Sequence, residues 1–164
     1  MQPQTADLLD ANEEAARAGT IRIVAPMFRH FGGLTRFAGS VATIKLFEDN
    51  SLVRKVLEKA GAGRVLVIDG GGSQRCALVG DQLARLGVQN HWAGIIVYGC
   101  IRDSNAMRQM GIGVLALGTH PLKTVKKNVG EADVAITFGG VTFTPGEWIC
   151  ADEDGIIVSP HSLV

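Results

Sequence analysis

The stretch "VGDQLARLGVQNHWAGIIVYGCIRD", residues 79–103, decides the fold of this 164-residue chain. It begins with a Gly-Asp pair, continues through a segment of helical length, and ends with an apolar run and an Arg-Asp pair. The run "GIIVYG" (94–99) shows no alternation of polar and apolar residues, which is typical of a strand buried on both faces. We therefore predict a helix over 81–88 followed by a buried strand over 94–99.

Similar apolar runs lie on both sides of this stretch. "RVLVIDG" lies near residue 65 and "VLALG" near residue 115, and a segment of helical length separates each from the central run. Such a series predicts parallel strands in βαβ units. A further strand over 40–47, and a helix that begins after Asn50 and ends at Gly61, extend this core.

The two ends of the chain differ from the core. Residues 132–160 contain short strands separated by Gly-Gly and Pro-Gly, which predicts antiparallel hairpins. At the other end we expect a helix over 5–18 with Thr5 as its N-cap, and then a strand over 21–27. The prediction is one α/β domain over residues 1–164, with a parallel βαβ core, an added antiparallel β layer, and residues 1–20 as a helical segment packed on it.

Composition excludes several classes of function. Sixteen basic and sixteen acidic residues cancel, so no long-range field attracts nucleic acid or an anionic membrane. The basic segment "KTVKKN" (123–128) is interpreted as a solvated loop or edge. The first residues are too polar for a signal peptide, and no apolar run reaches the roughly 18 residues of a membrane span. We expect a cytoplasmic protein without a direct nucleic-acid or membrane partner.

The cysteines and histidines indicate neither a disulfide framework nor a zinc site. The three cysteines are odd in number, widely spaced and set among apolar residues, so we expect buried thiols. The four histidines show no ligand spacing.

Candidate site residues occur where two strands end. In open α/β sheets, ligands bind beyond the carboxyl ends of the parallel strands. Gly80 and Asp81 begin the helix between the first two apolar runs, and Arg102 and Asp103 follow the second run. If the two strands are adjacent and parallel, both pairs are within reach of one ligand.

Part of this set is suited to a carboxylate. Free N–H groups at the start of the 81–88 helix, notably those of Gln82 and Leu83, can bind an anion, and Gly80 leaves room for it. The planar guanidinium of Arg102 matches a carboxylate bidentately.

The remaining residues are suited to a metal. Asp103 is a hard oxygen ligand for Mg²⁺ or Mn²⁺, and Asp81 can bind a metal-bound water from the opposite side. Together the residues predict a site for a small 2-oxo acid, with its carboxylate on the helix start and Arg102 and its keto oxygen on the metal. The alternative is that Asp81 is only an N-cap and that Arg102 and Asp103 only begin the next helix.

Three other segments are candidates. "DGGGSQR" (69–75) lacks the G-x-G-x-x-G pattern, so we predict a turn on the wall of the same cleft. "FRHFGGLTRFAG" (28–39) either lines a ligand or a neighbouring chain, or is a plain turn. Acidic residues near the C-terminus are either exposed turn residues or supply a further acid across a subunit interface: Glu147, Asp152, Glu153 and Asp154.

Several motifs, in order, resemble the family that contains the regulator of ribonuclease E activity A (RraA) and the metal-dependent 4-hydroxy-4-methyl-2-oxoglutarate aldolases. They are "FEDNSLVRKVLE", "VLVIDGGGS", "GDQLA", "WAGIIVYGCIRD", "LGTHP" and "PGEWICADEDGIIV". The resemblance implies a swivelling β/β/α fold and a homotrimeric ring, sometimes doubled to a dimer of trimers, with clefts between subunits.

The family's aldolases carry a D-x20-R-D motif, which falls here on Asp81, Arg102 and Asp103. By this resemblance, residues 80–83 and Arg102 hold pyruvate and Asp103 binds the divalent metal. The aldolases also have an acidic residue three positions after the second Asp, where this chain has Ala106. Some members have been labelled menaquinone methyltransferases, but this chain has no methyl-donor motif.

Two functions from different classes follow. The first is a class II lyase that cleaves 4-hydroxy-4-methyl-2-oxoglutarate to two pyruvates and decarboxylates oxaloacetate, because both reactions leave the pyruvate enolate. No lysine stands in a comparable motif, which disfavours a Schiff base. The alternative is a protein-binding regulator of ribonuclease E. A ring protein with a vestigial site is a third option.

Overall fold

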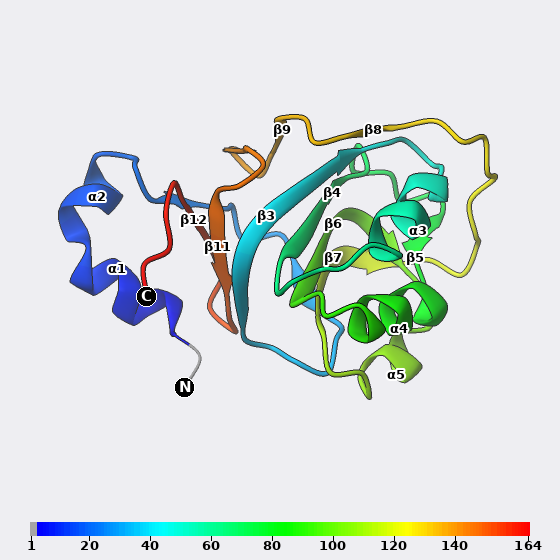
Figure 1. Ribbon diagram of the computed structural model, residues 1–164, viewed down its shortest axis with the longest axis horizontal. Coiled ribbons are helices and arrows are strands. Elements are labelled where there is room, and N and C mark those ends of the chain that lie inside the picture. Colours follow the sequence, from blue (N-terminus) through cyan, green and yellow to red (C-terminus); the bar gives the residue numbers. More distant parts are fainter. Residues whose placement is uncertain (1–2) are drawn as a thin grey trace.

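The computed structural model describes residues 3–164, and its centre is a parallel sheet. Strand β6 (Gly94–Ile101) lies between β4 (Val65–Asp69) and β7 (Gly113–Thr119) and runs parallel to both. Strand β3 (Phe37–Lys45) pairs parallel with β4 on its other edge. Every residue of β4 is buried, as expected for a strand covered on both faces. The predicted parallel core is confirmed (Figure 1).

An antiparallel layer continues the sheet beyond β3. The strand order is β1-β12-β11-β3-β4-β6-β7-β2, with β5 on β6 and β8 on β3, and β9 and β10 form a separate hairpin. The remaining strands are β1 (Arg22–Ile23), β2 (Arg29–His30), β5 (Ala77–Val79), β8 (Glu131–Ala132), β9 (Ile136–Phe138), β10 (Val141–Phe143), β11 (Trp148–Ala151) and β12 (Ile156–Ser159). The predicted C-terminal hairpins are therefore confirmed, and with them the α/β fold class.

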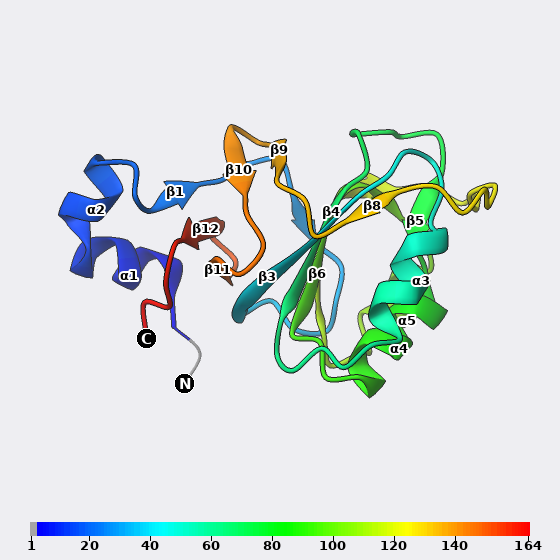
Figure 2. The same cartoon turned by 45° about the horizontal axis from the view of Figure 1, so that its top comes forward.

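Helices cover one face of the parallel strands. Figure 2 shows α3 (Ser51–Leu57), α4 (Asp81–Gln89) and α5 (Ser104–Met107) together on that face. Their apolar side chains, such as Leu57 and Met107, pack against the strands in one buried cluster. Helices α1 (Thr5–Ala11) and α2 (Glu13–Arg17) lie at the other end of the molecule, beside the antiparallel strands.

The N-terminal prediction is wrong in two details. The single helix expected over 5–18 is broken at Asn12, whose side chain donates a hydrogen bond to Leu8 O instead of continuing the helix. Thr5 is not the N-cap, because Gln4 holds that position. The buried Thr5 donates both its N–H and its hydroxyl to the Asp152 carboxylate, which ties the helix to the β11–β12 turn.

Two strand predictions also need correction. The strand expected over 21–27 is limited to Arg22–Ile23, because Ala25 N–H turns away to bond Gly139 O. Strand β5 was not predicted: a run of three apolar residues is too short to distinguish from a loop. This strand determines where Gly80 lies, because Gly80 follows β5 directly and not β4.

The three thiols are confirmed as free and buried. No helix in the described part of the chain is both long and apolar enough to cross a membrane.

Candidate active site

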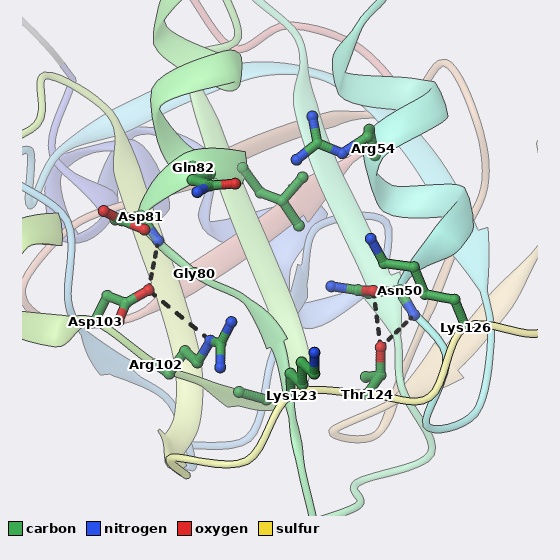
Figure 3. Close-up of a pocket in the computed structure, with 12 residues that line it drawn as sticks. Asn50, Arg54, Gly80, Asp81, Gln82, Arg102, Asp103, Lys123, Thr124 and Lys126 are labelled. Atoms are coloured by element: carbon green, nitrogen blue, oxygen red, sulfur yellow. Dashed lines mark hydrogen bonds and ion pairs between the residues drawn. The ribbon is translucent and has the colours of Figure 1, made fainter.

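Strands β5 and β6 bring the two predicted residue pairs together. They run parallel, and Arg102 N donates to Val79 O at 2.9 Å, so Gly80 and Arg102 leave the sheet side by side. Asp81 N donates to Asp103 Oδ2 at 3.1 Å, and Arg102 Nε lies 3.9 Å from the same oxygen (Figure 3). The structure therefore places the D-x20-R-D residues at one location.

Local backbone geometry directs Asp103 toward the start of α4. Asp103 has a left-handed conformation, with φ 58° and ψ 38°, immediately before α5. Aspartate tolerates this conformation better than most residues. A Cβ at position 80 would lie 2.7 Å from Asp103 Oδ2, closer than side chains normally approach. Gly80 is thus needed for the close approach of this carboxylate.

These residues open onto one cavity of about 150 Å³. A cavity of this size has room for a small ligand such as a short-chain acid together with water. The lining residues are Asn50, Arg54, Ala77, Gly80, Asp81, Gln82, Leu83, Arg102, Asp103, Lys123, Thr124 and Lys126.

The first turn of α4 offers hydrogen-bond donors to this cavity. Gly80 is the N-cap, so the alternative that Asp81 is an N-cap is wrong, whereas Asp103 does stand at the N-cap of α5 as the same alternative expected. The N–H of Asp81 is taken by Asp103, whereas the N–H groups of Gln82 and Leu83 have no acceptor within residues 3–164. Two free N–H groups at a helix start attract an anion.

The acidic groups fit a weakly held hard cation. Asp81 and Asp103 are the only carboxylates among the lining residues in the described chain, and Asp103 has 42% of its side chain exposed. No group of three or more potential ligand side chains occurs anywhere in residues 3–164. Mg²⁺ commonly uses one or two protein carboxylates and completes its shell with water and substrate oxygens. The donor set suits that mode and not a zinc cage.

The opposite wall of the cavity was not predicted. Thr124 Oγ1 donates to Asn50 Oδ1 at 2.8 Å and accepts from Asn50 N at 3.3 Å, which joins the 120–129 segment to the start of α3. Lys123 and Lys126, interpreted from the sequence as part of a solvated loop, line the cavity with Arg54. Figure 3 shows Arg54 and Lys126 across the cavity from Asp81 and Asp103.

A buried carboxylate fixes this segment. Asp49 Oδ2 accepts the N–H groups of Lys127 and Val129 at 2.9 and 3.1 Å, and Oδ1 accepts both donors of Ser51. Burial favours the protonated acid, but the hydrogen bonds from Ser51, Val129 and Lys127 outweigh it and lower the pKa of Asp49 to about 2. The cavity wall therefore has a defined conformation.

The other acidic candidates do not reach this cavity within their own chain. Glu147 pairs with Arg22 at 2.6 Å, and Glu153 pairs with Arg36 at 2.9 Å. Asp152 is buried under Thr5. Their proposed role across a subunit interface stays a prediction.

The glycine-rich segments serve packing. The expectation that 69–75 lines the cleft is wrong, because none of its residues belongs to the cavity wall, and Gly72 packs beside the Tyr98 ring. In 28–39, a Cβ on Gly32 would lie 2.2 Å from Ile112 O. Glycine is needed there for close approach to the chain's own backbone.

Comparison with known proteins places the chain in a family. The family model described as "RraA-like: Aldolase/RraA" matches residues 5–158. The chain belongs to the RraA-like family. A relative from Aromatoleum aromaticum is 63% identical over the full length of both chains, and one from Laribacter hongkongensis is 59% identical over 98% of each. Both have the provisional name 4-hydroxy-4-methyl-2-oxoglutarate aldolase.

Solved structures of RraA-like proteins share the fold. The RNA-processing inhibitor RraA from Thermus thermophilis is 46% identical, with a TM-score of 0.91 over 98% of this chain and 94% of its own. A protein from Geobacillus kaustophilus, described as an S-adenosylmethionine:2-dimethylmenaquinone methyltransferase, is 43% identical, with a TM-score of 0.93 over 98% and 97%. One fold therefore carries three different functional descriptions, and the site must decide between them.

Proposed function

We propose that this protein is a metal-dependent lyase that cleaves 4-hydroxy-4-methyl-2-oxoglutarate to two molecules of pyruvate and also decarboxylates oxaloacetate. The observation that carries the proposal is the convergence of Asp81, Arg102 and Asp103 with two free helix N–H groups on one small cavity. The names of the relatives support the same substrate.

Binding of the 2-oxo acid follows from the donors. The substrate's C1 carboxylate accepts hydrogen bonds from Gln82 N–H and Leu83 N–H and from the Arg102 guanidinium. Arg102 is 40% exposed and free to turn toward this anion, since its contact with Asp103 is long at 3.9 Å. These contacts orient the C2 carbonyl toward Asp103.

Asp103, assisted by Asp81, would hold a Mg²⁺ or Mn²⁺ ion. When bound beside the C2 carbonyl, this cation would withdraw electrons and stabilise the enolate.

Asp81 is suited to move the proton. Its carboxylate accepts the proton of the C4 hydroxyl, through a water where the two do not meet directly. The C3–C4 bond then breaks, its electron pair forms the pyruvate enolate, and C4 becomes the ketone of the second pyruvate. Protonation of the enolate at C3 completes the first pyruvate. Loss of CO₂ from oxaloacetate leaves the same enolate, so both reactions use the same contacts.

We also propose that the working form is a homotrimer or a dimer of trimers. In the 120–129 segment beside the cavity, the exposed fractions of Leu122, Val125 and Val129 are 59%, 71% and 64%. Three exposed large apolar side chains within eight residues favour a protein interface at this segment. A neighbouring copy that covers it would also enclose the cavity and exclude water.

The experiment that tests the enzymatic proposal is release of pyruvate by the purified protein. It is measured with 4-hydroxy-4-methyl-2-oxoglutarate and with oxaloacetate, with added Mg²⁺ or Mn²⁺ and with chelator. We expect two pyruvates per molecule of the first substrate and activity that needs the metal. Turnover unaffected by chelator would contradict the proposal.

A second candidate function rests on the 46% identity to the RNA-processing inhibitor. In this alternative, the protein binds ribonuclease E through its outer surface and needs no chemistry at the cavity. Inhibition of ribonuclease E by the same preparation, unchanged by chelator, is the result that favours it.

A further inference from the structure

The cavity carries more positive charge than one carboxylate requires. Four of its lining side chains are cationic, Arg54, Arg102, Lys123 and Lys126, whereas two are acidic, Asp81 and Asp103. A bound divalent cation would increase this excess. Because Arg102 and the α4 donors already account for the C1 carboxylate, the three remaining cations have no role in holding pyruvate itself.

These three cations have no acidic partner among residues 3–164. In the part of the chain that the structure describes, no carboxylate lies within ion-pair distance of Arg54, Lys123 or Lys126. Figure 3 shows Lys123 between Arg102 and Thr124 along the rim, and Lys126 and Arg54 farther along the same wall. Like charges that share a cavity repel one another, so an anion that lies between them is favoured.

The fold fixes the backbone that carries two of these cations, Lys123 and Lys126, whose side chains are exposed. Lys123 lies between Leu122, whose carbonyl accepts Ala77 N–H at 2.7 Å, and Thr124, which is 6% exposed and bonded to Asn50. Lys126 precedes Lys127, whose N–H is held by Asp49, 2% exposed. Backbone anchors on both sides reduce the entropy lost when the lysines bind a ligand.

We infer that Lys123 and Lys126, together with Arg54, are the side chains that bind the second carboxylate of a 2-oxo dicarboxylate and so distinguish it from a 2-oxo monocarboxylate. The inference rests on the proposed function for the placement of the C1 carboxylate. It adds that, in aldol cleavage, the carboxylate on C4 stays bound to these cations while C4 becomes a ketone. The three are specificity residues and take no part in proton transfer.

The test compares the binding of two ligands of equal chain length, neither of which can undergo the proposed aldol cleavage or decarboxylation. 2-Oxoglutarate has the second carboxylate, and 2-oxopentanoate lacks it. Calorimetry with Mg²⁺ present gives a dissociation constant for each with wild type, with the Lys123→Gln/Lys126→Gln double variant and with Arg54→Gln. Lys127→Gln and Lys55→Gln are matched controls, because they remove neighbouring lysines that do not line the cavity.

We expect wild type to bind 2-oxoglutarate at least about tenfold more tightly than 2-oxopentanoate, since a charged hydrogen bond typically contributes that much. The double variant should lose most of this preference and Arg54→Gln part of it, with 2-oxopentanoate binding unchanged and both controls like wild type. Equal binding of the two ligands by wild type, or an equal loss for both in the variants, would overturn the inference. So would lysine changes that weaken binding of a short RNA and leave 2-oxoglutarate unaffected. An inactive wild type that still prefers 2-oxoglutarate would refute the lyase and retain the second carboxylate site.

Discussion

Replacement of Gly80 by alanine tests how closely the site is fitted around Asp103. The backbone at Gly80 has φ −121° and ψ −170°, which alanine adopts without strain. The new Cβ would lie 2.7 Å from Asp103 Oδ2 and must separate to at least 3.4 Å for ordinary contact, so the carboxylate must shift by at least 0.7 Å. Ligand–metal distances in proteins normally lie within about 0.2 Å of their standard values. The substitution should therefore displace the proposed metal ligand and leave the fold in place.

The expected result is a fall of roughly 10–100-fold in kcat/KM for oxaloacetate at limiting Mg²⁺, or about 1.4–2.7 kcal/mol. The free energy of unfolding should change by about 1 kcal/mol or less, because the hydrogen bond from Asp81 N to Asp103 is exposed. Gly111→Ala is the control, since a Cβ there meets nothing within 4 Å. A Gly80→Ala protein with wild-type kinetics and metal dependence would refute this account of the site.

Three further predictions concern charge, stability and assembly. Arg102→Lys keeps the charge but loses the bidentate fork, so kcat/KM for oxaloacetate should fall by about tenfold or more, and unchanged kinetics would remove Arg102 from the site. Asp49→Asn places an amide against two N–H donors and should lower the free energy of unfolding in urea by about 1–3 kcal/mol at pH 7. Folding lowers the pKa of Asp49 from 3.8 to about 2, so the stabilisation by its carboxylate is complete above pH 3.8 and is lost as the pH falls toward 2. The difference in free energy of unfolding between wild type and Asp49→Asn should therefore shrink over that range. A constant difference would contradict the assigned cause. Light scattering at micromolar concentration should give the mass of a trimer or its multiple, and a monomer would contradict the proposed assembly.

The sequence predicted the elements whose signals are local. Continuous apolar runs identified β4, β6 and β7, and the strand–helix alternation correctly made them parallel neighbours. That arrangement predicted that Asp81 and Arg102 would meet, but the strand that places Gly80 and Asp81 beside Arg102 is β5, which was missed.

The cavity wall formed by 120–129 could not be predicted, because its signals are long-range. Asp49 and Val129 are 80 residues apart, and nothing in "KTVKKN" indicates that a distant carboxylate fixes its backbone. Asn50 was interpreted only as the cap of the next helix, and Asp49 before it was not singled out. Asp49 accepts Ser51 N–H, but its second oxygen holds the loop that carries the lysines.

The most direct test of the central claim compares metal-dependent pyruvate release by wild type and Asp103→Asn. The asparagine keeps the shape of the side chain but removes the charge that holds a hard cation. At saturating oxaloacetate, we predict that pyruvate release by wild type requires Mg²⁺ or Mn²⁺. The metal-dependent rate of the variant should be lower by at least about 100-fold. Circular dichroism and oligomer mass should stay the same, because a carboxylate with 42% of its side chain exposed contributes little to packing. Equal, metal-independent release of pyruvate by both proteins would contradict a metal-dependent lyase at this site.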